Sequence, residues 1–172
     1  LTTVRGLNHL EGMEVAILAD GSVSANQTVT GGAITLPSPA SKVCVGLPYT
    51  CQLQTLYLDI PGAPTVQGKR KNVQAATIRL ESSRGVQVGT NQPDQSTQPN
   101  NAQPAWADMK EIKQRTPSIY PGVAIPLFSG DARILVPGQW AKPGQVAVQQ
   151  TYPLPANILA VISEWTIGDT NG

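Results

Sequence analysis

The sequence predicts a mainly β protein: an antiparallel β-sandwich or barrel-like module, or two such modules, with long loops and at most one short helix. Apolar and polar residues alternate over several short segments, which is the period of a strand with one buried face. The 172 residues include 16 glycines and 15 prolines, a density that implies many turns and few long helices. Charged residues make up only 13% of the chain, too few for the surface of a helical bundle.

In the N-terminal third, each expected strand ends at turn-forming residues. Segment 13–19 has one strongly apolar face and stops at an Asp-Gly pair, which is typical of tight hairpins. Segment 27–30 ends at two glycines, and segment 34–36 ends at prolines that cannot donate to a sheet. Segments 42–46 and 49–58 follow, rich in Val, Thr, Tyr and Leu, and we expect both to be strands.

The next expected elements are a hairpin and a short helix. Segments 73–80 and 86–88 flank residues 82–85, which we expect to form the turn, with Gly85 in a left-handed conformation. Segment 105–114 is the helix candidate, and Asp108 could cap it.

Three more strands are expected towards the C-terminus, over 132–136, 146–152 and 157–167. The last of these is apolar on both faces. We therefore predict that it is a central strand buried on both sides.

Interruptions in the strand pattern divide the chain. Residues 61–72 contain Pro, Gly and the basic run, and we expect them to connect a first β unit, 1–60, to a second, 73–172, unless the two share one core. Residues 90–104 are polar and lack periodicity, so we predict a long mobile loop there.

Composition excludes several classes of function. A net charge of +1 provides no global basic field for nucleic acid, and no window of about 18 apolar residues could span a membrane. His9 is the single histidine, Glu11 and Glu14 fall on opposite faces of a strand, and phosphate or dinucleotide glycine motifs are missing. We expect no enzymatic activity, no cofactor and no metal site.

The two cysteines leave two alternatives. Cys44 and Cys51 match no zinc or redox spacing, and they could be free thiols or one disulfide. Free thiols are favoured because Cys44 lies in an alternating apolar run, like a small core residue.

Two groups of residues are candidates for binding. The adjacent cations Lys69, Arg70 and Lys71 could contact DNA phosphates, although a solvated linker is the favoured interpretation. Trp106 and Trp140 lie in turn-rich segments and could stack on sugars, although burial in a core or a subunit contact is favoured.

An ordered series of short segments resembles a known family. The segments 6–12 and 15–21 resemble the pattern GLxHLEGxxVxVLADG. The others follow in order over nearly the whole chain: 31–36, 40–43, 45–50, 53–56, 67–71, 83–89, 126–131 and 153–156. The series is similar to the large tail proteins of short-tailed bacteriophages and prophages, described as tail tubular protein B, tail nozzle or packaged-DNA stabilisation proteins.

The resemblance implies a structural role for a C-terminal portion of a longer protein. Such proteins form a ring below the portal, hexameric in the family, that contacts other tail subunits and the tail adaptor protein and helps retain packaged double-stranded DNA. Contact with DNA would be weak and non-specific, and the location would be the virion tail, or the host cytoplasm during assembly. The family motif carries no catalytic residues, and the polar stretch 91–104 and the cysteines depart from its pattern.

A second hypothesis comes from another class. The chain could be a carbohydrate- or receptor-binding module of a tail appendage, which would require Trp106 and Trp140 to be displayed together. A nozzle module requires these rings to be buried or spread along a subunit contact.

Overall fold

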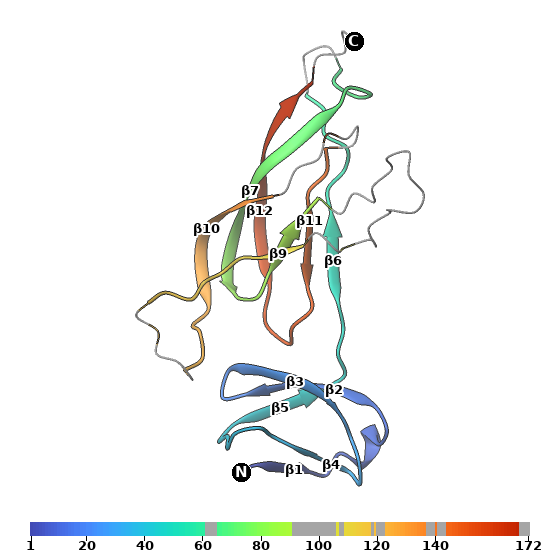
Figure 1. Ribbon diagram of the computed structural model, residues 1–172, viewed down its shortest axis with the longest axis vertical. Coiled ribbons are helices and arrows are strands. Elements are labelled where there is room, and N and C mark those ends of the chain that lie inside the picture. The colour runs from blue at the N-terminus through green and yellow to red at the C-terminus, as the bar shows by residue number, and fades with distance from the viewer. Residues whose placement is uncertain are drawn as a thin grey trace.

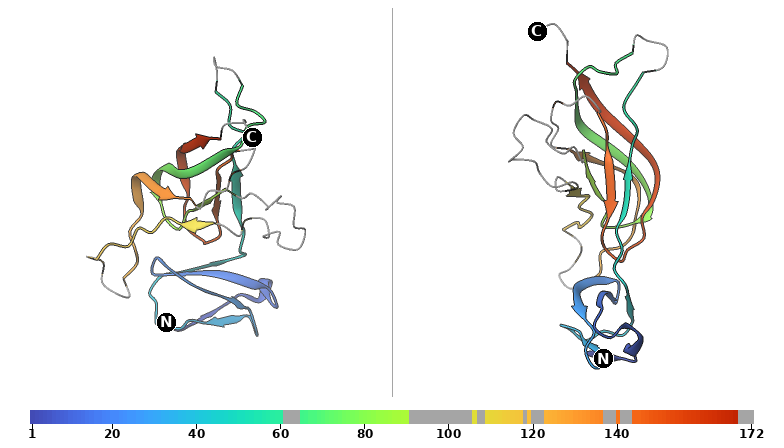
Figure 2. Two further views of the ribbon diagram at one scale, coloured as in Figure 1. Left: turned by 45° about the horizontal axis from the view of Figure 1, so that its top comes forward. Right: turned by 90° about the vertical axis from the view of Figure 1, so that its right-hand side faces the viewer.

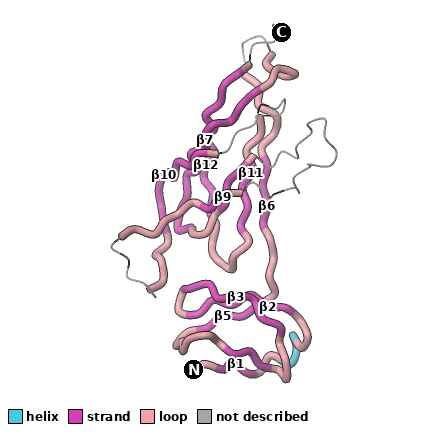
Figure 3. The backbone as a smooth tube through the Cα atoms, in the orientation of Figure 1, coloured by secondary structure: helices cyan, strands magenta, loops and turns pink. Residues whose placement is uncertain are grey.

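The computed structural model is mainly β and sandwich-like, and the predicted fold class is confirmed (Figures 1 and 3). It describes residues 1–60, 65–90, 106, 109–117, 119, 123–136, 140 and 144–168. The strands pair antiparallel in four separate sheets. Helix within this part of the chain is limited to one 3-10 turn, η1 (Asn8–Leu10).

The N-terminal unit, residues 1–46, is built from two small sheets, seen in blue at the foot of Figure 1. One pairs β1 (Thr3–Arg5) with β4 (Ala33–Thr35), and the other has the order β3 (Ser22–Thr28), β2 (Glu14–Ala19), β5 (Val43–Gly46). Their apolar faces enclose a core of Leu7, Val15, Ile17, Val29, Ile34, Leu36 and Ala40.

The predicted hairpin turn at Asp20 and Gly21 is confirmed. Both residues have positive φ, 46° and 77°, and they join β2 to β3. This is the backbone that a two-residue hairpin of matching twist requires, and Asp-Gly adopts it readily.

The C-terminal unit, residues 51–168, is a sandwich of two sheets on a shared core (Figure 2). The first sheet has the order β10 (Phe128–Leu135), β7 (Lys71–Ser83), β12 (Asn157–Ile167). The second has the order β6 (Cys51–Gln54), β11 (Ala147–Gln150), β8 (Gln87–Gly89), β9 (Lys110–Glu111). Both contribute to one cluster of buried residues: Val73, Ala76, Ile78, Leu80, Val86, Val88, Ile112, Val136, Val146 and Val148.

The predicted hairpin between 73–80 and 86–88 is wrong, because the chain changes sheets there. β7 pairs with β10 and β12, whereas β8 pairs with β11 and β9. Gly85 does have positive φ, +73°, and a Cβ there would lie 2.9 Å from the Tyr152 ring. Gly85 therefore allows the chain to turn from one sheet of the sandwich to the other.

The prediction of a central strand over 157–167 is also wrong. β12 has the predicted bounds but lies at the edge of its sheet, and β7 is the central strand. Apolar side chains face outward on β12, where Leu159 is 60% exposed and Ile162 is 46% exposed.

The helix predicted for 105–114 is not formed in the described part of that segment. Lys110 and Glu111 form β9 on the edge beside β8, and Ile112 enters the core. The weak helical pattern is overridden by burial of one side chain and by pairing with a strand. The predicted loop 90–104 lies, apart from Thr90, outside the described residues.

Two smaller expectations differ from the structure. β6 pairs with β11, so the last strand of the expected unit 1–60 belongs to the sheets of the other unit. Cys44 and Cys51 are free, as favoured, but Cys44 is exposed rather than in the core, because it lies opposite Leu18 on the outward face of its sheet.

Candidate functional site: the junction between the two units

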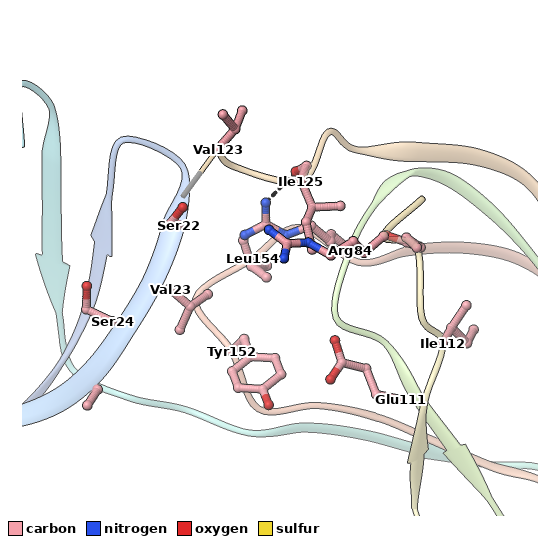
Figure 4. Close-up of a pocket in the computed structure, with 13 residues that line it drawn as sticks. Ser22, Val23, Ser24, Arg84, Glu111, Ile112, Val123, Ile125, Tyr152 and Leu154 are labelled. Atoms are coloured by element: carbon pink, nitrogen blue, oxygen red, sulfur yellow. Dashed lines mark hydrogen bonds between the residues drawn. The ribbon is translucent and has the colours of Figure 1, made fainter. Parts of the chain in front are cut away.

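Arg84 ties the two units together. Its side chain is buried, and its guanidinium donates to the carbonyl oxygens of Ile125 and of Gly21, the latter at 2.7 Å (Figure 4). Gly21 belongs to the N-terminal hairpin, whereas Arg84 and Ile125 belong to the C-terminal unit. The planar, positively charged guanidinium of Arg84 therefore bridges the junction between the two units.

The backbone of Arg84 is held as firmly as its side chain. Its N–H donates to the Pro155 carbonyl at 3.2 Å, and the Gln150 side chain donates to its carbonyl at 2.6 Å. The guanidinium is therefore positioned by the corner of the sandwich before it reaches the N-terminal unit.

A cleft of about 480 Å³ lies beside Arg84. Val23 of β3 lines it from the N-terminal unit and Tyr152 from the C-terminal unit (Figure 4). Glu111 is the one acid among the described residues of its lining, which contain neither histidine nor cysteine. Among its lining side chains, Arg84 binds backbone carbonyls of both units, whereas the buried side-chain amide of Gln114 has no hydrogen-bond partner among the described residues.

The acidic residues of the first motif fix turns in the N-terminal unit. Glu11 accepts hydrogen bonds from the backbone N–H groups of Gly31 and Gly32 at 2.8 and 2.7 Å. Asp20 accepts from the N–H groups of Ser41 and Lys42, and these bonds lower the pKa of its carboxyl. Each carboxylate therefore holds together, through hydrogen bonds, two segments that are distant in sequence.

Segments that carry the family resemblance meet at Arg84. Arg84 lies in 83–89, Gly21 ends 15–21, Pro155 lies in 153–156, and Ile125 immediately precedes 126–131. Sequence reasoning missed Arg84 as a junction residue. The signal for Arg84 in the sequence is its position within 83–89, one of the segments that carry the family resemblance.

The basic run is only partly on the surface. Arg70 is exposed and Lys69 is half-buried, but Lys71 is the first residue of β7 and only 1% exposed. Its aliphatic chain packs against Gly144, and its Nζ lies 3.5 Å from the Lys69 carbonyl. The candidate DNA contact at Lys71 is therefore wrong, because strand alternation turns this side chain inward.

The two candidate tryptophans differ in environment. Trp140 is 49% exposed and lies against Gly168, whose N–H donates to the Arg70 carbonyl. Trp106 is half-buried and has a φ of 68°. The structure thus brings Trp140 close to the backbone of Arg70, a pairing that the sequence did not indicate.

The remaining chemical candidates are dispersed. His9 is exposed in η1, and Glu14 is exposed at the start of β2. Within the described ranges, no group of three His, Cys, Asp or Glu residues could hold a metal ion. Among the same residues, no helix has the length and apolar character needed to cross a bilayer.

Ion pairs lie on the outer face of the sheet β10-β7-β12. Arg79 binds Asp131 at 2.7 Å, and Arg133 reaches across β7 to Glu164 at 2.6 Å. Each arginine lowers the pKa of its acidic partner, mainly through the side-chain hydrogen bond.

Apolar side chains are exposed next to these ion pairs. Leu135 at the end of β10 is 63% exposed, in addition to Leu159 and Ile162 of β12. Large apolar side chains that are exposed on a surface can mark contacts with other chains.

Comparison with known proteins gives no assignment. No protein-family model matches the chain, and no curated protein matches it significantly.

Proposed function

We propose that the chain is a non-enzymatic structural module of a short-tailed phage tail, forming part of the nozzle ring below the portal that helps retain and conduct DNA. The convergence of resembling segments at Arg84 carries this proposal. Glu11 and Asp20 of these segments stabilise turns, and Arg84 joins the two units. A structural module under mechanical load requires such rigid connections.

The outer surface of the C-terminal unit supports a place in an assembly. Leu135, Leu159 and Ile162 are largely exposed on the two edge strands of one sheet. A neighbouring subunit would remove these side chains from water at about 25 cal/mol per Å² of apolar area. The expected neighbours are other copies in a homo-oligomeric ring and the tail adaptor protein, within the virion tail.

DNA contact would be weak and without sequence preference. The exposed cation of the basic run is Arg70, with Lys69 half-buried beside it. Few cations release few counterions on binding, so a wall of this kind lets DNA slide.

Imaging of the full-length protein by electron microscopy tests the proposal. A ring with a central hole is expected, with the exposed leucines at or near subunit contacts. Leu159→Asp should then weaken ring assembly while leaving the fold intact. A full-length protein that stays monomeric and binds no other tail component would overturn the proposal.

The half-exposed Trp140 favours one competing function, a carbohydrate- or receptor-binding module. Screening the chain against glycans distinguishes the two. Binding that is lost in Trp140→Ala, with an unchanged melting temperature, would favour the module, whereas no binding would favour the nozzle.

A further inference from the structure

Among the residues that the structure describes, the strand β6 has a hydrogen-bonded neighbour on one side only. Within the described residues it pairs with β11 alone and ends the order β6-β11-β8-β9. The N–H of Thr55 donates to the Val146 carbonyl, and the register then directs the backbone groups of Leu53 and Cys51 towards β11. The N–H and C=O of Gln52 therefore point out of the open edge.

This edge lacks the usual protection against pairing. Residues 43–58 contain no charged side chain, and all four residues of β6 are exposed. Leu53 is 46% exposed, and Leu56 and Tyr57 beyond it are 89% and 64% exposed. Natural edge strands carry charges, prolines or bulges that prevent such pairing, and β6 has none of these.

A ladder of glutamine side chains runs across the sheet and ends at this edge. Gln149 donates to Gln87 at 2.7 Å, and Gln52 donates to Gln149 at 3.1 Å. These three residues lie directly opposite one another on neighbouring strands. A carboxamide offers two N–H donors and one acceptor oxygen. The ladder uses one N–H of Gln52, which leaves its second N–H and its Oε1 outside the ladder.

We propose that the open edge of β6 pairs antiparallel with β6 of a second copy of this chain, with Gln52 opposite Gln52 of the second copy. The outward backbone groups of the two residues then exchange two hydrogen bonds. Their carboxamides also bond reciprocally, which joins the two glutamine ladders into one. Leu53 of each copy lies opposite Cys51 of the other, so apolar groups meet on the same face.

The chemistry of the edge favours a second copy as its occupant. Two-fold pairing sets each residue against itself or a near neighbour, which would place like charges together on a charged strand. A neutral segment centred on a self-complementary amide has no such penalty. A two-fold contact also closes on itself and cannot build a ring, so this inference does not rest on the proposed function.

Sedimentation of the whole chain is the first test. The wild-type chain should show a monomer–dimer equilibrium. Leu53→Lys should raise the dimer Kd at least about tenfold, because it places two cations on the same face of the contact, one on each side of the Gln52 pair. Met13→Lys is the matched control, because Met13 is 47% exposed but belongs to the N-terminal unit, and it should leave the Kd unchanged. A wild-type chain that remains monomeric at the highest soluble concentration would overturn the inference.

Cysteine cross-linking tests the register without a destabilising charge. In a Cys44→Ser, Cys51→Ser background, Gln52→Cys should form an intermolecular disulfide under mild oxidation, because paired residues lie about 5.5 Å apart between Cα atoms. Gln54→Cys should not, because it would lie opposite residue 50 of the second copy. Equal cross-linking at both positions, or none at position 52, would contradict the pairing.

Discussion

Arg84 illustrates how one residue can decide the arrangement of two cores. Its guanidinium has little exposure to water, and both carbonyl oxygens that it binds would lose their donor if the side chain were removed. Hydrogen bonds to a charged group contribute about 1.5–3 kcal/mol to stability, more than an ordinary hydrogen bond between neutral groups.

We therefore expect Arg84→Ala to lower the free energy of unfolding by about 2 kcal/mol. Arg84→Lys should recover only part of this loss, because an ammonium group does not reproduce the planar fork of arginine. Urea unfolding followed by circular dichroism measures both values. Arg115→Ala is the control, since Arg115 is exposed and lines the same cleft. A loss in Arg84→Ala that is no larger than the loss in this control would show that the bridge has no structural role.

Acid should destabilise the fold through carboxylates whose pKa is lowered. Hydrogen bonds from Ser41 and Lys42 lower the pKa of Asp20, and Arg79 lowers that of Asp131. The folded state then binds fewer protons than the unfolded one, whose aspartates titrate near about 3.9. The stabilisation is present above that pH and is lost as the pH falls below it.

The melting temperature should accordingly change little between about pH 6 and 8 and fall below about pH 4. Asp20→Asn removes one of these carboxylates, so its melting temperature should fall less steeply in acid than that of the wild-type chain. Thermal melts over the pH series make the comparison. Identical acid slopes would show that Asp20 does not contribute.

At the scale of elements, comparison of two glycines distinguishes the energetic cost of backbone strain from the cost of overpacking a side chain. Gly68 and Gly144 both have positive φ, +83° and +59°. A Cβ at Gly68 would meet nothing within 4 Å, whereas at Gly144 it would lie 2.8 Å from Cδ of the buried Lys71.

Gly68→Ala should cost about 1 kcal/mol, the penalty for an L-residue in the left-handed region. Gly144→Ala should cost about 1–3 kcal/mol more, because a buried lysine cannot move aside. Chemical denaturation of both variants gives the difference directly. Equal losses would mean that Lys71 relaxes freely.

The sequence predicts where strands lie better than how they pair. The bounds of β12 follow from its apolar run, and the Asp-Gly hairpin follows from local backbone preference. The place of β12 at a sheet edge does not, because Leu159 and Ile162 are apolar although they face outward. Strand order depends on contacts between residues such as Asn157 and Glu81, which no local pattern encodes.

The candidate site follows the same rule. Glu11 and Asp20 are evident in the sequence motif, but the backbone N–H groups that bind them lie about twenty residues further along the chain. The burial of Lys71 is not evident from the sequence, because the boundary between connector and strand falls inside the basic run, at the first residue of β7. Element boundaries depend on tertiary pairing as well as on propensity.

At the scale of the whole molecule, the low net charge limits the affinity for DNA. The net charge is +1, and Arg70 is the exposed member of the basic run. Electrostatic binding scales with the number of neutralised phosphates and weakens with salt.

We expect weak or undetectable binding of duplex DNA at about 150 mM salt, with no sequence preference. At low salt, Arg70→Ala should reduce any residual binding, whereas Lys110→Ala, on the exposed edge strand β9, should not. Fluorescence anisotropy with labelled duplexes measures this. Tight, sequence-selective binding would contradict a passive channel wall.

The pairing of β6 with β11 has a consequence during synthesis of the chain. The core of the N-terminal unit uses strands within residues 3–46, so it can form soon after those residues leave the ribosome. Gln54 must wait for Ala147, 93 residues later, which at cellular elongation rates is roughly 5 to 20 s. During that interval an uncharged segment with exposed Leu and Tyr has no strand beside it. The nascent protein is therefore most prone to aggregation after its first unit has folded, and chaperones that bind apolar extended chains have their best target at residues 43–58.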